Sequence, residues 1–126
     1  MRATYTPAIA MAVLLSGCNT GPGACTASFE PGITVRAFDA QTSENVTDGA
    51  QGTVVEGAYV DSLRPAGHDG AGRVLVLSAA HERPGTYHLF VERAGYQAVS
   101  LSAVDVTQDE CHVRTVALDV TMVPIP

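Results

Sequence analysis

The sequence contains no lysine and no tryptophan, and only 16% of its 126 residues are charged. Seven arginines, scattered singly along the chain, stand against 13 Asp and Glu residues, which gives a formal net charge of −6 at pH 7. Such a chain lacks the cationic patch that neutralises phosphate groups, so we expect no nucleic-acid partner. With 46% hydrophobic residues, the composition also differs from that of a disordered protein.

The sequence also lacks a hydrophobic stretch long enough for a membrane-spanning helix, which needs roughly 20 apolar residues. The apolar stretch from Ala8 to Leu15 is far shorter. A single positive charge, Arg2, precedes it, and the small residues Ser16 and Gly17 follow it. This order is typical of a secretory signal peptide, which we predict over residues 1–17.

The four residues Leu15-Ser16-Gly17-Cys18 resemble the lipobox of bacterial lipoproteins. The resemblance implies cleavage before Cys18, diacylation of its thiol and a lipid-anchored location in the cell envelope. Two or more acyl chains make a stable anchor, so the membrane is the first expected partner. In Gram-negative lipoproteins a residue such as Asn19 at the next position accompanies sorting to the outer membrane. The alternative is an ordinary secretory signal that ends beside a cysteine by chance.

Beyond the lipidated cysteine and a short flexible tether, residues 18–24, we predict one all-β domain over residues 25–126. Short apolar runs with a period of two alternate with clusters of Gly, Pro, Asp and Asn. Tyr87, Leu89 and Val91 form one apolar face in this pattern. The segment 64–72 is the most loop-like part of the domain. Six or seven short strands at this spacing indicate an antiparallel two-sheet sandwich of the prealbumin-like or immunoglobulin-like kind.

The two remaining cysteines, Cys25 and Cys111, come just before the predicted first and last strands. Outside the cytoplasm such cysteines are expected to form a disulfide. Two free buried thiols are the alternative. Metal coordination by Cys25, Cys111 and His112 is a weaker one, because no further ligand stands at the spacing of a metal site.

The stretch from Gly85 to Tyr96, GTYHLFVERAGY, follows the pattern G-x-Y-x-L-x-V-x-x-x-G-Y. It resembles the carboxypeptidase regulatory-like domains, which are transthyretin-type sandwiches. The resemblance covers residues 84–123 well and residues 33–39 more loosely. In carboxypeptidases this domain is an accessory without catalytic residues, and the resemblance implies the same here. The fold by itself does not determine a function. The hydrolase of this fold ends in a Tyr-Arg-Gly-Ser tail, which this chain lacks.

The polar residues suggest no catalytic constellation and no metal site. His68, His81, His88 and His112 stand at no metal-ligand spacing, and we predict that all four face solvent. No serine lies in a Gly-x-Ser-x-Gly elbow. Asp105, Asp109, Glu110 and Asp119 could supply oxygen ligands to a cation, but a solvated acidic loop is the preferred interpretation. The loop residues 68–70 are a generic candidate for contact with a partner.

We therefore expect a lipid-anchored envelope protein, without cofactor and monomeric, whose non-catalytic sandwich serves binding or structural display. The alternative is a carbohydrate- or peptide-binding accessory module of an envelope enzyme complex, whose partner is another envelope protein or a glycan. Exposed aromatic side chains on one sheet face would favour this alternative, and the candidates are Tyr59, Phe90 and Tyr96. A small hydrolase is a third, less favoured hypothesis.

Overall fold

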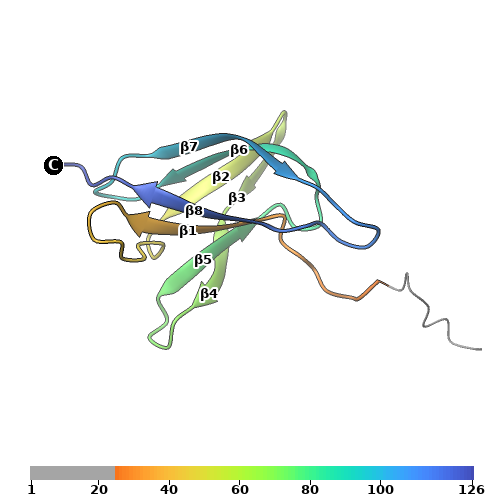
Figure 1. The fold of residues 1–126 in the computed structure, drawn as a ribbon, viewed down its shortest axis with the longest axis horizontal. Helices are drawn as coiled ribbons and strands as arrows, with labels where there is room; N and C mark the ends of the chain where they lie inside the picture. Colours follow the sequence, from red (N-terminus) through yellow and green to blue (C-terminus); the bar gives the residue numbers. More distant parts are fainter. Residues whose placement is uncertain (1–24) are drawn as a thin grey trace, which may run out of the picture.

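The computed structural model describes residues 25–126, which form two four-stranded β-sheets without any helix (Figure 1). This confirms the predicted all-β sandwich. The predicted signal peptide, Cys18 and the tether lie outside the described residues. The strands are β1 (Ile33–Asp39), β2 (Gln51–Glu56), β3 (Tyr59–Ser62), β4 (Arg64–His68), β5 (Val74–Ala79), β6 (Gly85–Glu92), β7 (Val99–Val106) and β8 (Val116–Met122).

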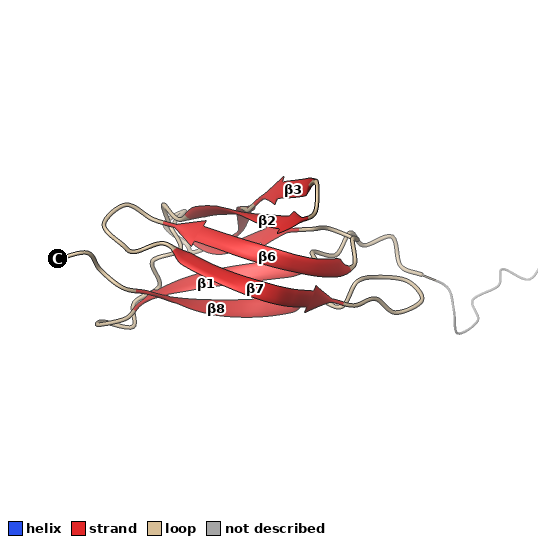
Figure 2. Cartoon of the chain, turned by 90° about the horizontal axis from the view of Figure 1, so that it is seen from above, coloured by secondary structure: helices blue, strands red, loops and turns tan. Residues whose placement is uncertain are grey.

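The first sheet has the strand order β4-β5-β1-β8 and the second has the order β3-β2-β6-β7. Every pairing of neighbouring strands is antiparallel except that of β1 with β8, which run parallel from Ile33 beside Val116 to Asp39 beside Met122. A parallel pair needs a long connection, and here the other strands supply it. Figure 2 shows the two sheets as the layers of the sandwich.

The structure has eight strands instead of the predicted six or seven. The extended material after Thr53 divides into the hairpin β2–β3, with Gly57 in its turn. The segment 64–72, predicted as a loop, contains β4, so this prediction is wrong. Strand β4 contains Pro65 and Gly67, and its pairing with β5 is irregular between Pro65 and His68. It lies at the edge of its sheet, where a strand tolerates proline.

The core lies between the sheets and is built from alternate residues of the strands, as the period of two predicts. On β6, Tyr87, Leu89 and Val91 are each at most 1% exposed, whereas Phe90 between them is 44% exposed. On β1, the buried positions Ile33 and Val35 alternate with more exposed ones. The alternation fixes which side chains of each strand face outward, and these outward side chains form the candidate site described below.

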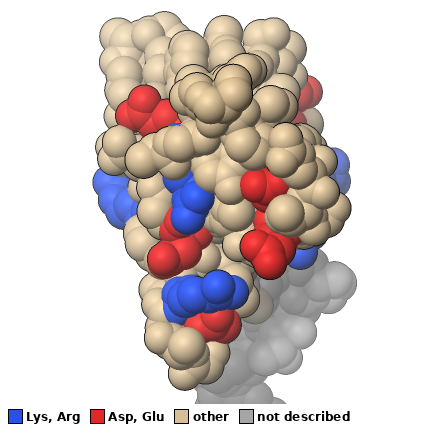
Figure 3. Space-filling model, turned by 90° about the vertical axis from the view of Figure 1, so that its left-hand side faces the viewer, with Lys and Arg blue, Asp and Glu red and all other residues tan. Residues whose placement is uncertain are grey.

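The two ends of the sandwich differ. Cys25, the first described residue, forms a disulfide with Cys111, and the chain enters at this end (Figure 1). The disulfide confirms the predicted pairing of these two cysteines. The last residues of strand β6 and the C-terminus of the chain lie at the opposite end (Figure 1). Figure 3 views that opposite end, where acidic and basic side chains lie beside one another rather than in patches of one sign.

Candidate functional site

The outer face of the sheet β3-β2-β6-β7 carries the clearest candidate site. His88, Phe90 and Glu92 occupy alternate positions of β6 and point away from the core. Across the sheet, Thr53 of β2 and Ser100 of β7 are the direct neighbours of Phe90. This face therefore brings an aromatic ring, an imidazole, a carboxylate and two hydroxyl groups together on three strands.

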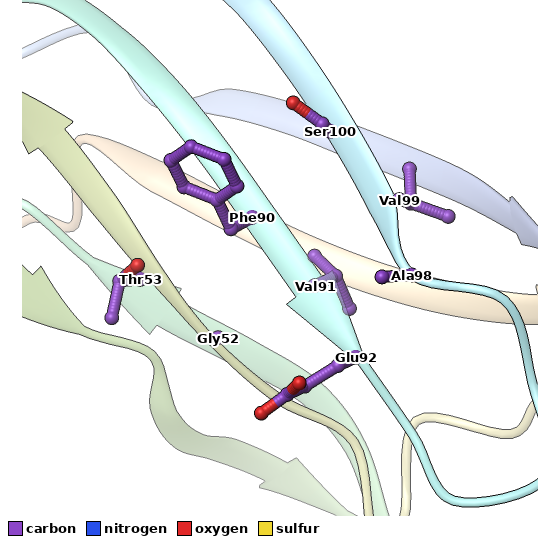
Figure 4. A pocket seen from close by; sticks show the side chains of 8 residues that line it. All are labelled: Gly52, Thr53, Phe90, Val91, Glu92, Ala98, Val99 and Ser100. Atoms are coloured by element: carbon purple, nitrogen blue, oxygen red, sulfur yellow. The ribbon is translucent and has the colours of Figure 1, made fainter.

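A pocket of about 290 Å³ lies on this face, at the end of β6 and the start of β7 (Figure 4). Part of its floor is Gly52, where a Cβ atom would collide with the carbonyl oxygen of Phe90. Glu92 also lines two adjoining hollows, so it stands where all three meet. The side chains that line the pocket are those of Thr53, Phe90, Val91, Glu92, Ala98, Val99 and Ser100.

Some side chains that line the pocket contact neighbouring side chains through hydrogen bonds or ring stacking. The rings of His88 and Phe90 are stacked, with centroids 4.4 Å apart and an interplanar angle of 5°. His88 Nε2 lies 2.6 Å from Ser100 Oγ, so the hydroxyl and the imidazole share a hydrogen bond. Gln51 Nε2 donates to Glu92 Oε1 at 3.0 Å. One oxygen of Glu92 is engaged in this way, and no arginine in residues 25–126 forms an ion pair with this carboxylate.

A second polar cluster lies at the disulfide end. Glu82 Oε1 lies 2.6 Å from His112 Nδ1 and accepts from the backbone N–H of Glu30 at 2.8 Å. These contacts, first the N–H of Glu30 and then His112, hold the pKa of the Glu82 carboxyl below its usual value. The hydrogen bond to Glu82 raises the pKa of His112. His112 Nε2 in turn lies 3.1 Å from Thr26 Oγ1.

The prediction that all four histidines face solvent is wrong for His112, whose side chain is only 19% exposed. Its partner Glu82 lies in a turn, not in a strand, and has a left-handed backbone conformation with φ of 51°. His81 beside it stacks on Phe29, with ring centroids 5.1 Å apart. His68 is exposed at the end of β4. The sequence alone gave no sign of the Glu82–His112 pair, because its members are 30 residues apart.

The acidic residues do not gather into a cation site. Asp109 accepts from the backbone N–H groups of Cys111 and His112, which shapes the loop before β8. Asp105 and Asp119 lie on different strands, where they contact Thr86 and Arg36. Within the described part of the chain, no group of three or more His, Cys, Asp or Glu side chains is placed to hold a metal ion. The loop residue Asp69 pairs with Arg73 at 3.0 Å.

Only one of the three aromatic residues proposed for a binding face is exposed. Tyr59 and Tyr96 are half-buried and pack against the core, and the hydroxyl of Tyr96 donates to Asp39 Oδ2 at 2.7 Å. Phe90 is exposed, as expected. Sequence reasoning overlooked Phe29, which is 72% exposed near the disulfide end.

No helix among the described residues is long and apolar enough to cross a membrane. Cys18, the predicted lipidation site, lies outside those residues, so its role stays a prediction. No family model matches the chain, and no curated protein matches it.

Proposed function

We propose that this protein is a lipid-anchored component of a bacterial cell envelope and that its sandwich is a non-catalytic binding domain. The lipobox-like residues that end at Cys18 support the proposed anchor. We also propose that the domain is of the carboxypeptidase regulatory-like kind. Buried Tyr87 and Leu89, together with the left-handed φ of 84° at Gly95, suit the structural roles that the resemblance implies for these residues.

The observation that carries the binding role is the pocket around Phe90 and Glu92. Single exposed apolar residues are ordinary, but here an exposed ring adjoins a concave surface with a carboxylate and hydroxyl groups. The pocket is formed by the end of β6 and the start of β7. These strand ends lie at the end of the sandwich opposite Cys25 (Figure 1). A domain anchored seven residues before Cys25 would then hold this pocket away from the membrane surface.

Binding is preferred over hydrolysis because the groups that a hydrolase needs are divided between two places. Nucleophilic catalysis combines a hydroxyl, a base, an acid that orients the base, and a substrate pocket. Ser100 and His88 adjoin the pocket, but among the described residues no carboxylate accepts a hydrogen bond from His88 Nδ1. The hydroxyl of Thr26, the imidazole of His112 and the carboxylate of Glu82 do contact one another in series. These three side chains lie at the disulfide end, away from that pocket.

A comparison of the full-length chain with its Cys18→Ser variant, both expressed in a Gram-negative host, tests the anchor. We expect the unsubstituted protein in the membrane fraction and in the detergent phase of a cloud-point extraction, and the variant in the aqueous phase. A Thr20→Ser variant is the control, because it makes a small change two positions after Cys18 without touching the lipobox or the disulfide. Equal partitioning of the unsubstituted chain and Cys18→Ser would contradict the anchor.

A further experiment tests the absence of catalysis. We expect the triple substitution of His68, His88 and His112 to glutamine to leave unchanged any hydrolysis of p-nitrophenyl acetate by the purified protein. A loss of turnover in the triple variant, with the folded spectrum retained, would instead favour the hydrolase hypothesis.

A further inference from the structure

Residues 25–126 twice combine an arginine, an aromatic ring and a carboxylate. Arg83 Cζ lies 3.7 Å from the centroid of the Tyr59 ring, and its Nη1 donates to Glu56 Oε1 at 3.0 Å. A guanidinium is planar, so it can lie over a ring while its N–H groups reach a carboxylate.

The second combination lies on the other sheet. Arg36 Cζ is 5.4 Å from the centroid of the Phe38 ring, and both its Nε and its Nη2 donate to Asp119, at 2.8 and 2.9 Å. In both places the cation comes from the chain itself. Ring and carboxylate thus act together as the receptor for one positive group.

The pocket on the outer face has the ring and the carboxylate without the cation. His88 covers one face of the Phe90 ring, and Phe90 and Glu92 stand two positions apart on β6 in the lining of the same pocket (Figure 4). Alternate residues of a strand are about 6.6 Å apart, a separation that one flat cation in the pocket can bridge to contact both the ring and the carboxylate. In residues 25–126 no arginine lies over Phe90 and none forms an ion pair with Glu92.

The arginine next in sequence, Arg93, is engaged elsewhere. Its Nε donates to the carbonyl oxygen of Asp48 at 2.8 Å, and its Cζ lies 5.2 Å from the centroid of the Tyr96 ring. The carboxylate of Glu92 is therefore the only charged group in the lining of the pocket. A positive ligand group would complement both this local charge and the overall charge of −6.

We propose that this pocket binds the guanidinium or ammonium group of a basic side chain on an extended segment of a partner protein. The inference rests on the proposed binding function and names its ligand. A neutral glycan fits less well, because it needs several free hydrogen-bonding groups, whereas Ser100 already bonds His88 and Glu92 Oε1 already bonds Gln51. Within the described residues, a ring face, the Thr53 hydroxyl and the second carboxylate oxygen of Glu92 have no such partner, and of these the ring and the carboxylate are the pair that receives a cation.

The test is a titration of the full-length ¹⁵N-labelled protein, in non-ionic detergent, with the peptide acetyl-Thr-Arg-Thr-Arg-Thr-Arg-amide. We expect amide shifts at Thr53, Glu92 and Ser100. Replacing every arginine of the peptide by citrulline, which keeps the shape and removes the charge, should weaken binding at least about tenfold. Glu92→Gln should weaken binding of the arginine peptide by a similar factor. Glu110→Gln, which removes an exposed carboxylate from the loop before β8, is the matched control and should bind normally.

Equal binding of the arginine and citrulline peptides, or unchanged binding by Glu92→Gln, would overturn the inference. The neutral sugar maltohexaose is the comparison ligand. Shifts of the same three amides with the sugar but not with the peptide would also overturn it, while leaving the proposed binding face intact. If neither ligand shifts these amides, the inference and the binding face both fail, and the lipid anchor is judged separately by the Cys18→Ser comparison.

Discussion

At the scale of single residues, the side chain of Glu82 joins three separate segments of the domain. Its carboxylate accepts from the N–H of Glu30, contacts His112 Nδ1 and lies 3.4 Å from the N–H of Val113. Its backbone adopts a left-handed conformation, which costs free energy in a residue other than glycine. These contacts offset that cost and hold the segment before β1 and the loop before β8 together, beside the Cys25–Cys111 disulfide.

The Glu82–His112 pair predicts a specific pH dependence of stability. Because its folded pKa is raised above 6.5, His112 contributes stability that is fully present below pH 6.5 and is lost as the pH rises through the folded value. The pKa of Glu82 is lowered from 4.5, so its contribution is present above pH 4.5 and is lost only as the pH falls through the folded value. The pair therefore stabilises the fold most in the weakly acidic range between these values.

We expect the Tm of the unsubstituted protein to exceed that of His112→Gln at about pH 5.5 and the difference to shrink by about pH 8.5. Circular-dichroism melts over a pH series measure it. His68→Gln, which changes an exposed histidine, is the control and should melt like the unsubstituted protein throughout. A Tm difference between the unsubstituted protein and His112→Gln that does not change with pH would contradict the assignment.

At the scale of elements, the two faces of strand β6 have different roles. Its inward residues fill the core and its outward residues form the pocket. This division predicts opposite results for neighbouring substitutions. Leu89→Ala removes a fully buried side chain and should lower the free energy of unfolding by about 2–5 kcal/mol.

Phe90→Ala, one position along, should lower the free energy of unfolding by less than about 1 kcal/mol, because its ring is 44% exposed, yet it should abolish binding of the arginine peptide. Urea denaturation followed by circular dichroism measures both variants. A Phe90→Ala variant as unstable as Leu89→Ala would mean that the ring belongs to the core.

The close approach of β2 to β6 predicts a strict requirement for glycine at position 52. A Cβ there would collide with the backbone of Phe90, so Gly52→Ala should cost about 1–3 kcal/mol of unfolding free energy. Gly70→Ala is the matched control, since nothing lies within 4 Å of a Cβ at that position. The same denaturation measurement compares the two, and equal stability would show that β2 can move away from β6 without cost.

Elements with regular alternation were predictable from sequence, and irregular ones were not. The period of two correctly identified β6 and its buried face, because alternation follows directly from strand geometry. Strand β4 was missed because Pro65 and Gly67 weaken its pattern, and only the neighbouring strand β5 holds the segment extended. Pairing between strands distant in sequence, such as β1 with β8, is set by the packing of the whole sandwich and leaves no local pattern.

At the scale of the whole molecule, the Cys25–Cys111 disulfide joins residues that are 86 positions apart. Closing so long a loop restricts the unfolded chain, so replacing both cysteines by serine should lower the free energy of unfolding by roughly 4–5 kcal/mol in the chain-entropy model. Guanidinium denaturation of the double variant measures this. Adding a reductant to the unsubstituted protein should reproduce the loss, and stability insensitive to both changes would contradict it.

The candidate site as a whole could be predicted only in part. Phe90 was among the aromatic residues proposed for a binding face, because its position on β6 is opposite to the buried positions. The participation of Glu92, Gly52 and Ser100 depends on the register of β2 and β7 against β6, which no local sequence pattern determines. Tyr59 on β3 and Tyr96 after β6, equally plausible in sequence, pack against the core instead, and long-range contacts such as the hydrogen bond from Tyr96 to Asp39 leave no local pattern.

The proposed lipid anchor and the proposed binding role of the pocket together describe a protein attached to the membrane at one end of its domain, with its binding site toward the opposite end. The mass of the N-terminal peptide of the protein purified from bacterial membranes tests this account most directly. We predict a chain that begins at Cys18 and carries a diacylglyceryl group on the thiol, with or without an acyl chain on the amine. An N-terminal peptide with an unmodified Cys18 thiol would contradict the account.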